Sequence, residues 1–216
     1  MKFLAFMTII LFSSCQNYVN KTVSIAESNS NLTNVSPKTT DKTPDESKSL
    51  SELADLANEQ TIRLKPSKFD NLPQEITNNL EERGCTIPQT WHLKTPHNVI
   101  NGEYSQKGQK DWAVLCSVNR VSSILVFWNG STKNVADIAK SEDIGYFQTV
   151  DSNNEMGFSR AIDTVNEKYI IDRYNSYGGA KPPQIDHEGI NDAFVEKASY
   201  VLYFHRGKWL ELQGAD

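Results

Sequence analysis

The stretch DWAVLCSVNRVSSILVFW, residues 111–128, decides the fold of this chain. It contains two apolar runs, residues 112–116 and 123–128, which Asn119 and Arg120 separate. Short apolar runs that are rich in β-branched and aromatic residues are typical of strands. Because the apolar residues are continuous and do not alternate with polar ones, we expect both faces of these strands to be covered, at least in part.

Further strands are predicted towards the C-terminus. Residues 199–204 and 208–212 predict a hairpin about Arg206 and Gly207. The apolar residues 169–171 predict another strand. We therefore expect a mainly antiparallel sheet.

Two helices are predicted before these strands. Ser49 and Glu52 have the spacing of a capping box, and apolar residues recur at helical intervals over about residues 50–60. The apolar stripe of this helix would dock on the domain or bind a partner helix. A second helix begins at Pro73 and stops at Gly84. Its inner face is predicted to consist of Leu72, Ile76 and Leu80. Two or three helices on such a sheet make an α+β domain.

Length and charge exclude several classes of protein. The chain has 216 residues, which fits one domain of ordinary size with a tail. Its net charge is -5, which argues against the basic face that nucleic-acid binding needs. Only residues 3–12 form an apolar run that could meet a bilayer, so a polytopic membrane protein is excluded.

The N-terminus has the order of a secretory signal: a basic start, an apolar run and then small residues. We expect residues 1–14 to be the signal peptide. The sequence LFSS before Cys15 resembles a bacterial lipobox, which implies that Cys15 becomes the acylated (palmitate-bearing) first residue of a lipoprotein. The sorting habits of lipoproteins imply that Gln16 does not retain the protein at the inner membrane. The expected location is the cell envelope, at the outer membrane, facing the periplasm or the cell surface.

Composition divides the rest of the chain. Residues 15–48 are polar and carry too little apolar surface to fold, so we expect a lipidated, disordered tether. Residues 49–64 are expected to be the short amphipathic helix and a linker. Residues 65–216 are expected to be the globular α+β domain.

With Cys15 lipidated, Cys85 and Cys116 remain as an even pair. In an oxidising compartment such a pair is most simply a disulfide. The bond would fix the end of the second helix to the first strong strand.

A pattern of glycine, aspartate, strand and aromatic strand occurs twice, beginning at Gly108 with Asp111 and at Gly189 with Asp192. An aspartate at this spacing can accept hydrogen bonds from turn amides. Both places resemble the FG-GAP repeat of integrin-type propellers, but two repeats cannot close a propeller, so we interpret them as hairpins. In such repeats loop carboxylates often bind calcium. Here the candidate ligands are Asp186, Glu188 and Asp192, with a turn bonded to itself as the alternative.

Four longer stretches resemble a family of uncharacterised bacterial secreted proteins and lipoproteins. They are RGCTIPQ at residues 83–89, DWAVLCS at 111–117, YGG..PP..DHEGI at 177–190 and RGKWLELQGAD at 206–216. The resemblance implies that residues 69–216 form one coherent domain, and it implies no particular activity.

Residues 177–192 are the candidate site. His187 between Asp186 and Glu188 could act as a general acid or base, and the alternative is that these groups satisfy turn amides. Trp91 and Tyr177 are candidate ligand-binding residues. The chain contains no serine-hydrolase elbow, phosphate loop or helical zinc motif.

The sequence thus indicates a lipid-anchored envelope protein with a non-enzymatic binding or structural domain. It would contact the membrane through its lipid, and a second envelope protein is a candidate partner. Apart from calcium, no cofactor is indicated. The alternatives are a small extracytoplasmic hydrolase that uses Asp186, His187 and Glu188, and an inhibitor of a periplasmic enzyme.

Overall fold

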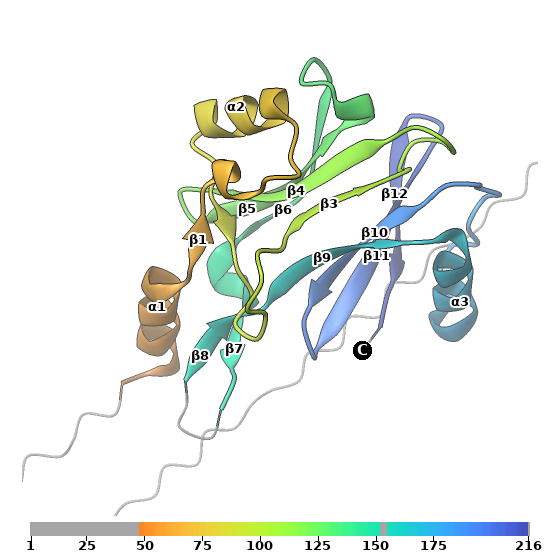
Figure 1. Cartoon of the computed structure of the whole chain (residues 1–216). Helices are drawn as coiled ribbons and strands as arrows, with labels where there is room; N and C mark the ends of the chain where they lie inside the picture. The colour runs from red at the N-terminus through yellow and green to blue at the C-terminus, as the bar shows by residue number, and fades with distance from the viewer. Residues whose placement is uncertain (1–47, 152–154, 216) are drawn as a thin grey trace, which may run out of the picture. The chain divides into compact units, whose positions relative to one another are not determined.

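A computed structural model describes residues 48–151 and 155–215 (Figure 1). The predicted signal peptide, Cys15 and the predicted tether up to residue 47 lie outside the described residues. The elements, in chain order, are α1 (Leu50–Gln60), β1 (Arg63–Leu64), η1 (Pro66–Lys68), α2 (Gln74–Glu82), β2 (Ile87–Pro88), β3 (Val99–Gly102), β4 (Asp111–Val118), β5 (Val121–Phe127), η2 (Trp128–Gly130), β6 (Val135–Glu142), η3 (Asp143–Tyr146), β7 (Phe147–Thr149), β8 (Met156–Phe158), β9 (Arg160–Val165), α3 (Glu167–Tyr177), β10 (Gly189–Phe194), β11 (Ala198–His205) and β12 (Lys208–Gln213).

Two four-stranded antiparallel sheets form the centre of the fold. Their strand orders are β3-β4-β5-β6 and β12-β11-β10-β9. Tight turns close both predicted hairpins: Asn119 and Arg120 have φ of 51° and 65°, and Arg206 and Gly207 have φ of 47° and 83°. Two consecutive residues with positive φ match the right-handed twist of the flanking strands. The antiparallel α+β class predicted from the sequence is confirmed.

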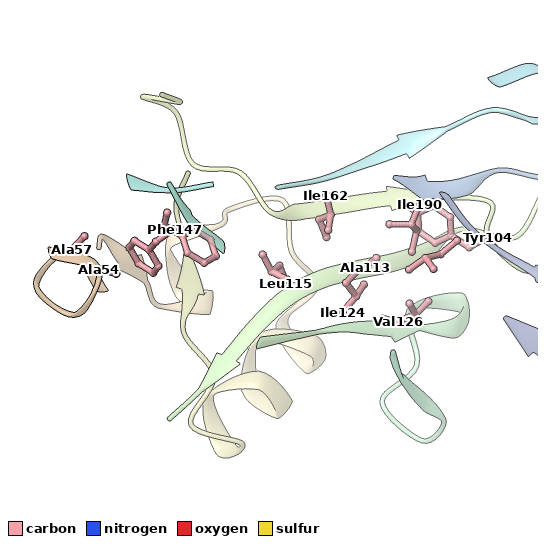
Figure 2. Packing of buried hydrophobic residues seen from close by; sticks show 12 residues of the cluster. Ala54, Ala57, Tyr104, Ala113, Leu115, Ile124, Val126, Phe147, Ile162 and Ile190 are labelled. Atoms are coloured by element: carbon pink, nitrogen blue, oxygen red, sulfur yellow. The ribbon is translucent and has the colours of Figure 1, made fainter. Parts of the chain in front are cut away.

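The inner faces of the two sheets share one apolar core (Figure 2). The first sheet contributes alternate residues of β4 and β5, and the second contributes one residue each from β9, β10 and β11. The buried residues from these strands are Ala113, Leu115, Ile124, Val126, Ile162, Ile190 and Leu202. Because successive side chains of a strand point to opposite faces, the remaining apolar residues of each strand must be covered from outside.

Helices cover both outer faces. Ile76 and Leu80 of α2 pack with Trp112, Val114 and other outward residues of the first sheet. On the second sheet, Ile170 of α3 packs with outward residues of β11 and β12, namely Val201, Tyr203 and Leu212. Seven of the eight residues of β4 are consequently buried, which confirms that this strand is covered on both faces.

The two predicted helices are present. Ser49 and Glu52 form the capping box of α1, in which the Ser49 N–H donates to Glu52 Oε2 at 2.7 Å. Buried Ala54 and Ala57 place the apolar stripe of α1 in the core, so this stripe docks on the domain. In α2, Pro73 is the N-cap, and Gly84 follows the helix with φ of 70°.

The predicted strand at residues 169–171 is wrong, because these residues lie in α3. The side chain of Asn166 caps this helix by accepting the N–H of Tyr169 at 2.9 Å. Ile170 points towards the sheet and is fully buried, whereas Lys168 and Asp172 form an exposed ion pair at i,i+4. A short apolar run fits one turn of a helix as well as a strand, and the cap decides between them.

The predicted disulfide joins Cys85 and Cys116, whose Cα atoms are 5.4 Å apart. Cys85 follows α2, and Cys116 lies in β4. The bond therefore fixes the end of this helix to the outer face of the first sheet.

The two glycine–aspartate patterns have different structures. Asp111 accepts hydrogen bonds from the backbone N–H of Tyr104 (3.0 Å), Ser105 (3.0 Å) and Asn129 (2.7 Å), as its turn role predicts. Gly189 is not in a turn but begins β10, where a Cβ would lie 2.8 Å from the carbonyl oxygen of Leu202. The resemblance of the two places is therefore confined to the hairpins that follow.

Arg160 is buried between the two sheets and makes an ion pair with Asp192. Nε donates to Asp192 Oδ1 at 2.9 Å, and Nη2 donates to Oδ2 at 2.7 Å. Nη1 donates to Ser122 Oγ at 3.0 Å, and Nη2 also donates to the carbonyl of Ala139 at 2.6 Å. Burial by itself lowers the pKa of Arg160, but the hydrogen bonds and charge of Asp192 outweigh burial and raise it.

We predict that Asp192→Ala lowers the free energy of unfolding by about 3–5 kcal/mol, because it leaves the Arg160 charge buried without a partner. Urea denaturation followed by circular dichroism measures the change. The control is Lys168→Ala, which removes an ion pair whose side chains are 82% and 45% exposed and which costs less than about 1 kcal/mol. Equal losses in the two variants would contradict the importance of the buried pair.

Candidate functional site

The structure places the predicted residues of the 177–192 loop in structural roles. His187 is buried, and its Nδ1 lies 2.9 Å from the carbonyl oxygen of Glu188. The Glu188 carboxylate accepts the backbone N–H of Glu103 at 2.8 Å, and the Glu188 N–H donates to the Glu103 carbonyl at 2.9 Å. Asp186 is exposed. The two contacts of Glu188 with Glu103 thus fix this loop to the segment that follows β3, whereas the contact of His187 lies within the loop.

The candidate calcium ligands are not gathered at one point. Both carboxylate oxygens of Asp192 accept hydrogen bonds from Arg160, and Asp192 lies inside the sandwich. Within residues 48–151 and 155–215, no group of three or more His, Cys, Asp or Glu side chains could hold a metal ion. Calcium prefers six to eight oxygen ligands, so Asp186 and Glu188 alone are a poor donor set.

The two aromatic candidates are both on the surface, in different settings. Tyr177 is the last residue of α3, is 38% exposed and lies beside Arg173, whose guanidinium is 5.6 Å from its ring centre. Trp91 lies in the segment between β2 and β3 and is 40% exposed. Only Trp91 borders a groove that other exposed apolar side chains also line.

This groove has a volume of about 300 Å³ and lies between the C-terminal end of α1, β8 and the Trp91 segment. Exposed Ile62 and Leu93 line it together with Trp91. The remaining lining residues are Ala57, Gln60, Thr61, Gln89, Thr90, Glu155, Met156, Gly157 and Phe158. The close approach of Trp91 to β8 needs Gly157, because a Cβ there would lie 2.6 Å from the Cβ of Trp91.

A buried network fixes both ends of the exposed segment, residues 91–96. Asn98, with φ of 70°, donates through Nδ2 to the carbonyl of Pro88 at 2.7 Å and accepts the N–H of Ile162 at 3.0 Å. Thr90 Oγ1 donates to the carbonyl of Arg160 at 3.1 Å. These bonds attach the segment to β9, the edge strand of the second sheet.

His97 completes the base of the segment as a neutral ring. Its Nε2 accepts the backbone N–H of Thr90 at 2.7 Å, so its Nδ1 carries the proton and donates to the carbonyl of Thr95 at 2.9 Å. Burial lowers the pKa of His97 below its ordinary value. Protonation of Nε2 would remove the acceptor that Thr90 uses.

The sequence indicated Trp91 as a candidate ligand-binding residue but not its neighbours in the groove. Ile62 follows a helix, and nothing in its own sequence context brings it to a loop thirty residues away. His97 and Asn98 were not selected, because a histidine and an asparagine near a proline are ordinary loop residues. The signal that was present is the stretch WHLK at residues 91–94, in which two large apolar side chains alternate with polar ones outside any predicted element.

A second aromatic group lies where β5 and the β11–β12 hairpin meet. The rings of Trp128 and Trp209 stack at 5.7 Å, and that of Phe204 is 4.8 Å from Trp128. These rings border a shallow recess of about 460 Å³ with Lys133 and Asn134. All three rings are partly buried, Trp128 and Trp209 pack against the inner core, and Phe204 packs on both of them, so we assign the group to packing.

Comparisons with protein-family models, curated proteins and solved structures give no match to this chain. No helix among the described residues is long and apolar enough to span a bilayer.

We predict that His97 makes the domain less stable as the pH falls below about 6.5. The unfolded chain binds the proton on His97 more readily than the folded chain does. The domain therefore keeps its full stability above the pKa of His97 in the unfolded chain and loses part of it as the pH falls towards the lower pKa in the folded chain. The loss reaches at most about 1.4 kcal/mol per pH unit. Urea denaturation between pH 7.5 and 5.5 should show a steeper dependence for the wild type than for His97→Gln. Parallel curves would contradict the role of His97.

Proposed function

We propose that this protein is a lipid-anchored protein of the cell envelope whose α+β domain is a non-catalytic binding module. One observation supports this function above the others. Among the described residues, the buried charged side chains are paired with one another or with backbone groups, whereas three large apolar side chains, Ile62, Trp91 and Leu93, are left exposed beside one groove.

Catalysis by an acid or base needs a side chain whose titrating atom is directed at a substrate. The buried ionisable groups have other partners. Asp192 pairs with Arg160, and Asp143 accepts from Arg63 at 2.9 Å and from Ser117 at 2.7 Å. Asp111 holds a turn. These contacts support a structural use for each group and favour binding over hydrolysis.

The surface around Trp91 has the character of a binding site. Aromatic and aliphatic side chains that are exposed beside a groove lose unfavourable contact with water when a partner covers them. The segment is also fixed at its base by His97, Thr90 and Asn98. A rigid segment loses little conformational entropy on binding, and this favours affinity.

The anchor itself rests on the N-terminal sequence, in which LFSS precedes Cys15. Acyl chains contribute about 0.8 kcal/mol for each buried methylene, so two or more chains hold a protein stably on a membrane. The disulfide between Cys85 and Cys116 agrees with an oxidising compartment.

We predict that Cys15→Ser abolishes lipid attachment. In cells fed a labelled palmitate, the wild type should carry the label and sediment with membranes, because the thiol of Cys15 is the acceptor of the lipid. The variant should carry no label. Mass spectrometry of the native protein should find Cys15 as its first residue. An unmodified Met1 in the mature protein would contradict the anchor.

We predict that Asp186→Ala and Glu188→Gln leave hydrolysis of ester, peptide and phosphate substrates unchanged from the wild type. Removing a general acid or base normally costs about a hundredfold or more in rate. A rate assay with each purified protein measures this. If the wild type cleaves one of these substrates and either variant is slowed to that extent, the domain is an enzyme and the proposal fails.

A further inference from the structure

Among the residues that the structure describes, seven large hydrophobic side chains are exposed. Four of them lie on α1 or near its C-terminal end. Ile62 is 66% exposed, Trp91 40% and Leu93 41%, and all three line the groove described above. Leu50, at the start of α1, is 67% exposed. We call the first three residues the Trp91 surface. Exposed apolar side chains that gather at one place are typical of protein or membrane interaction sites, whereas single ones are common on any surface.

We propose that the Trp91 surface inserts into the headgroup region of the bilayer that holds the lipid anchor. This inference rests on the proposed function, because the anchor supplies the bilayer. The binding partner of the Trp91 surface is thus a lipid layer, and the side chains of Trp91 and Leu93 insert into it.

The length and end point of the preceding chain favour this occupant. The described structure begins at Lys48, shortly before α1, and 32 residues lie between Cys15 and Lys48. The proposed anchor makes those residues a tether, and a flexible chain of that length has a root-mean-square span of about 30–35 Å. A tether of that length gives a local concentration of the order of millimolar, so a small apolar surface is enough for docking.

The chemistry of the segment fits the boundary between headgroups and acyl chains. Trp is enriched at this boundary because its ring is apolar and its N–H is polar. Leu93 adds an aliphatic side chain, and the following Lys94 can keep its ammonium in water while its stem covers apolar surface. Residues 89–98 contain no carboxylate that insertion would have to dehydrate.

Charge does not drive this docking. Glu155 lines the groove, and α1 exposes Glu52, Asp55 and Glu59. These carboxylates oppose an anionic surface, which attracts basic segments. Binding should therefore depend on apolar burial, should occur on zwitterionic lipid, and should vary little with salt.

Vesicle binding tests this inference without the lipid anchor. The probe is a vesicle of phosphatidylcholine, and the protein is residues 16–216, which lacks Cys15. Residues 46–216 are one compact unit and contain the complete described core, so this chain retains what folding needs. Co-sedimentation with lipid at millimolar concentration, which replaces the local concentration that the tether would supply, should show partitioning that persists between low and high salt.

Trp91→Ala combined with Leu93→Ala should lower the partition coefficient by about tenfold for each residue, because each loses apolar area that lipid would cover. The matched control is Tyr200→Ala, which removes a side chain that is 53% exposed on β11 and should leave partitioning unchanged. Thermal melting of each variant shows that it is folded.

Three results would overturn the inference: no partitioning of the 16–216 chain, equal partitioning of the double variant, or binding only to anionic vesicles that high salt abolishes. Capture of a protein by the wild type but not by the double variant, with no vesicle binding, would assign the surface to a protein partner instead. The anchor is tested separately by lipid labelling at Cys15, so failure of docking and failure of the anchor are distinguishable.

Discussion

Arg160 lies fully buried between the two sheets, where a charged guanidinium is tolerated only if its N–H groups have acceptors. Asp192 in β10 supplies two, Ser122 in β5 supplies its Oγ and its carbonyl oxygen, and Ala139 in β6 supplies its carbonyl oxygen. The carbonyl of Ala139 can serve because β6 bulges there, with φ of 52°. The ring of Tyr146 also lies 4.6 Å from the guanidinium carbon. One side chain thus fixes how the two sheets meet.

The same residue connects the core to the surface. Its backbone carbonyl accepts hydrogen bonds from Thr90 and Asn98, which fix the segment that carries Trp91. His97 closes that segment as a neutral ring. The exposed apolar side chains are therefore held by a rigid base, and this arrangement suits a surface that must meet a partner repeatedly in one orientation.

Much of the fold could be predicted because its signals are local. The hairpins about Asn119 and Arg206 follow from apolar runs around short turns, and α1 follows from its capping box. The predicted strand at residues 169–171 is wrong, because three apolar residues fit both a strand and a helix and the cap at Asn166 favours the helix. Of the candidate site, Trp91 was selected from the sequence as a candidate ligand-binding residue, whereas its association with Ile62 and Leu93 was not predicted.

The sequence by itself determined the antiparallel α+β class, the helix caps, the hairpin turns and the pairing of Cys85 with Cys116. The first three depend on neighbouring residues in the chain, and the disulfide follows because only two cysteines remain once Cys15 is assigned to the lipid. Only the tertiary structure decided the roles of Asp111 and Asp192, which stand in the same sequence pattern. Asp111 bonds to the amides of its own turn, but Asp192 faces a guanidinium 32 residues away in sequence. Contacts between distant residues depend on how the sheets pack, and no local pattern encodes them.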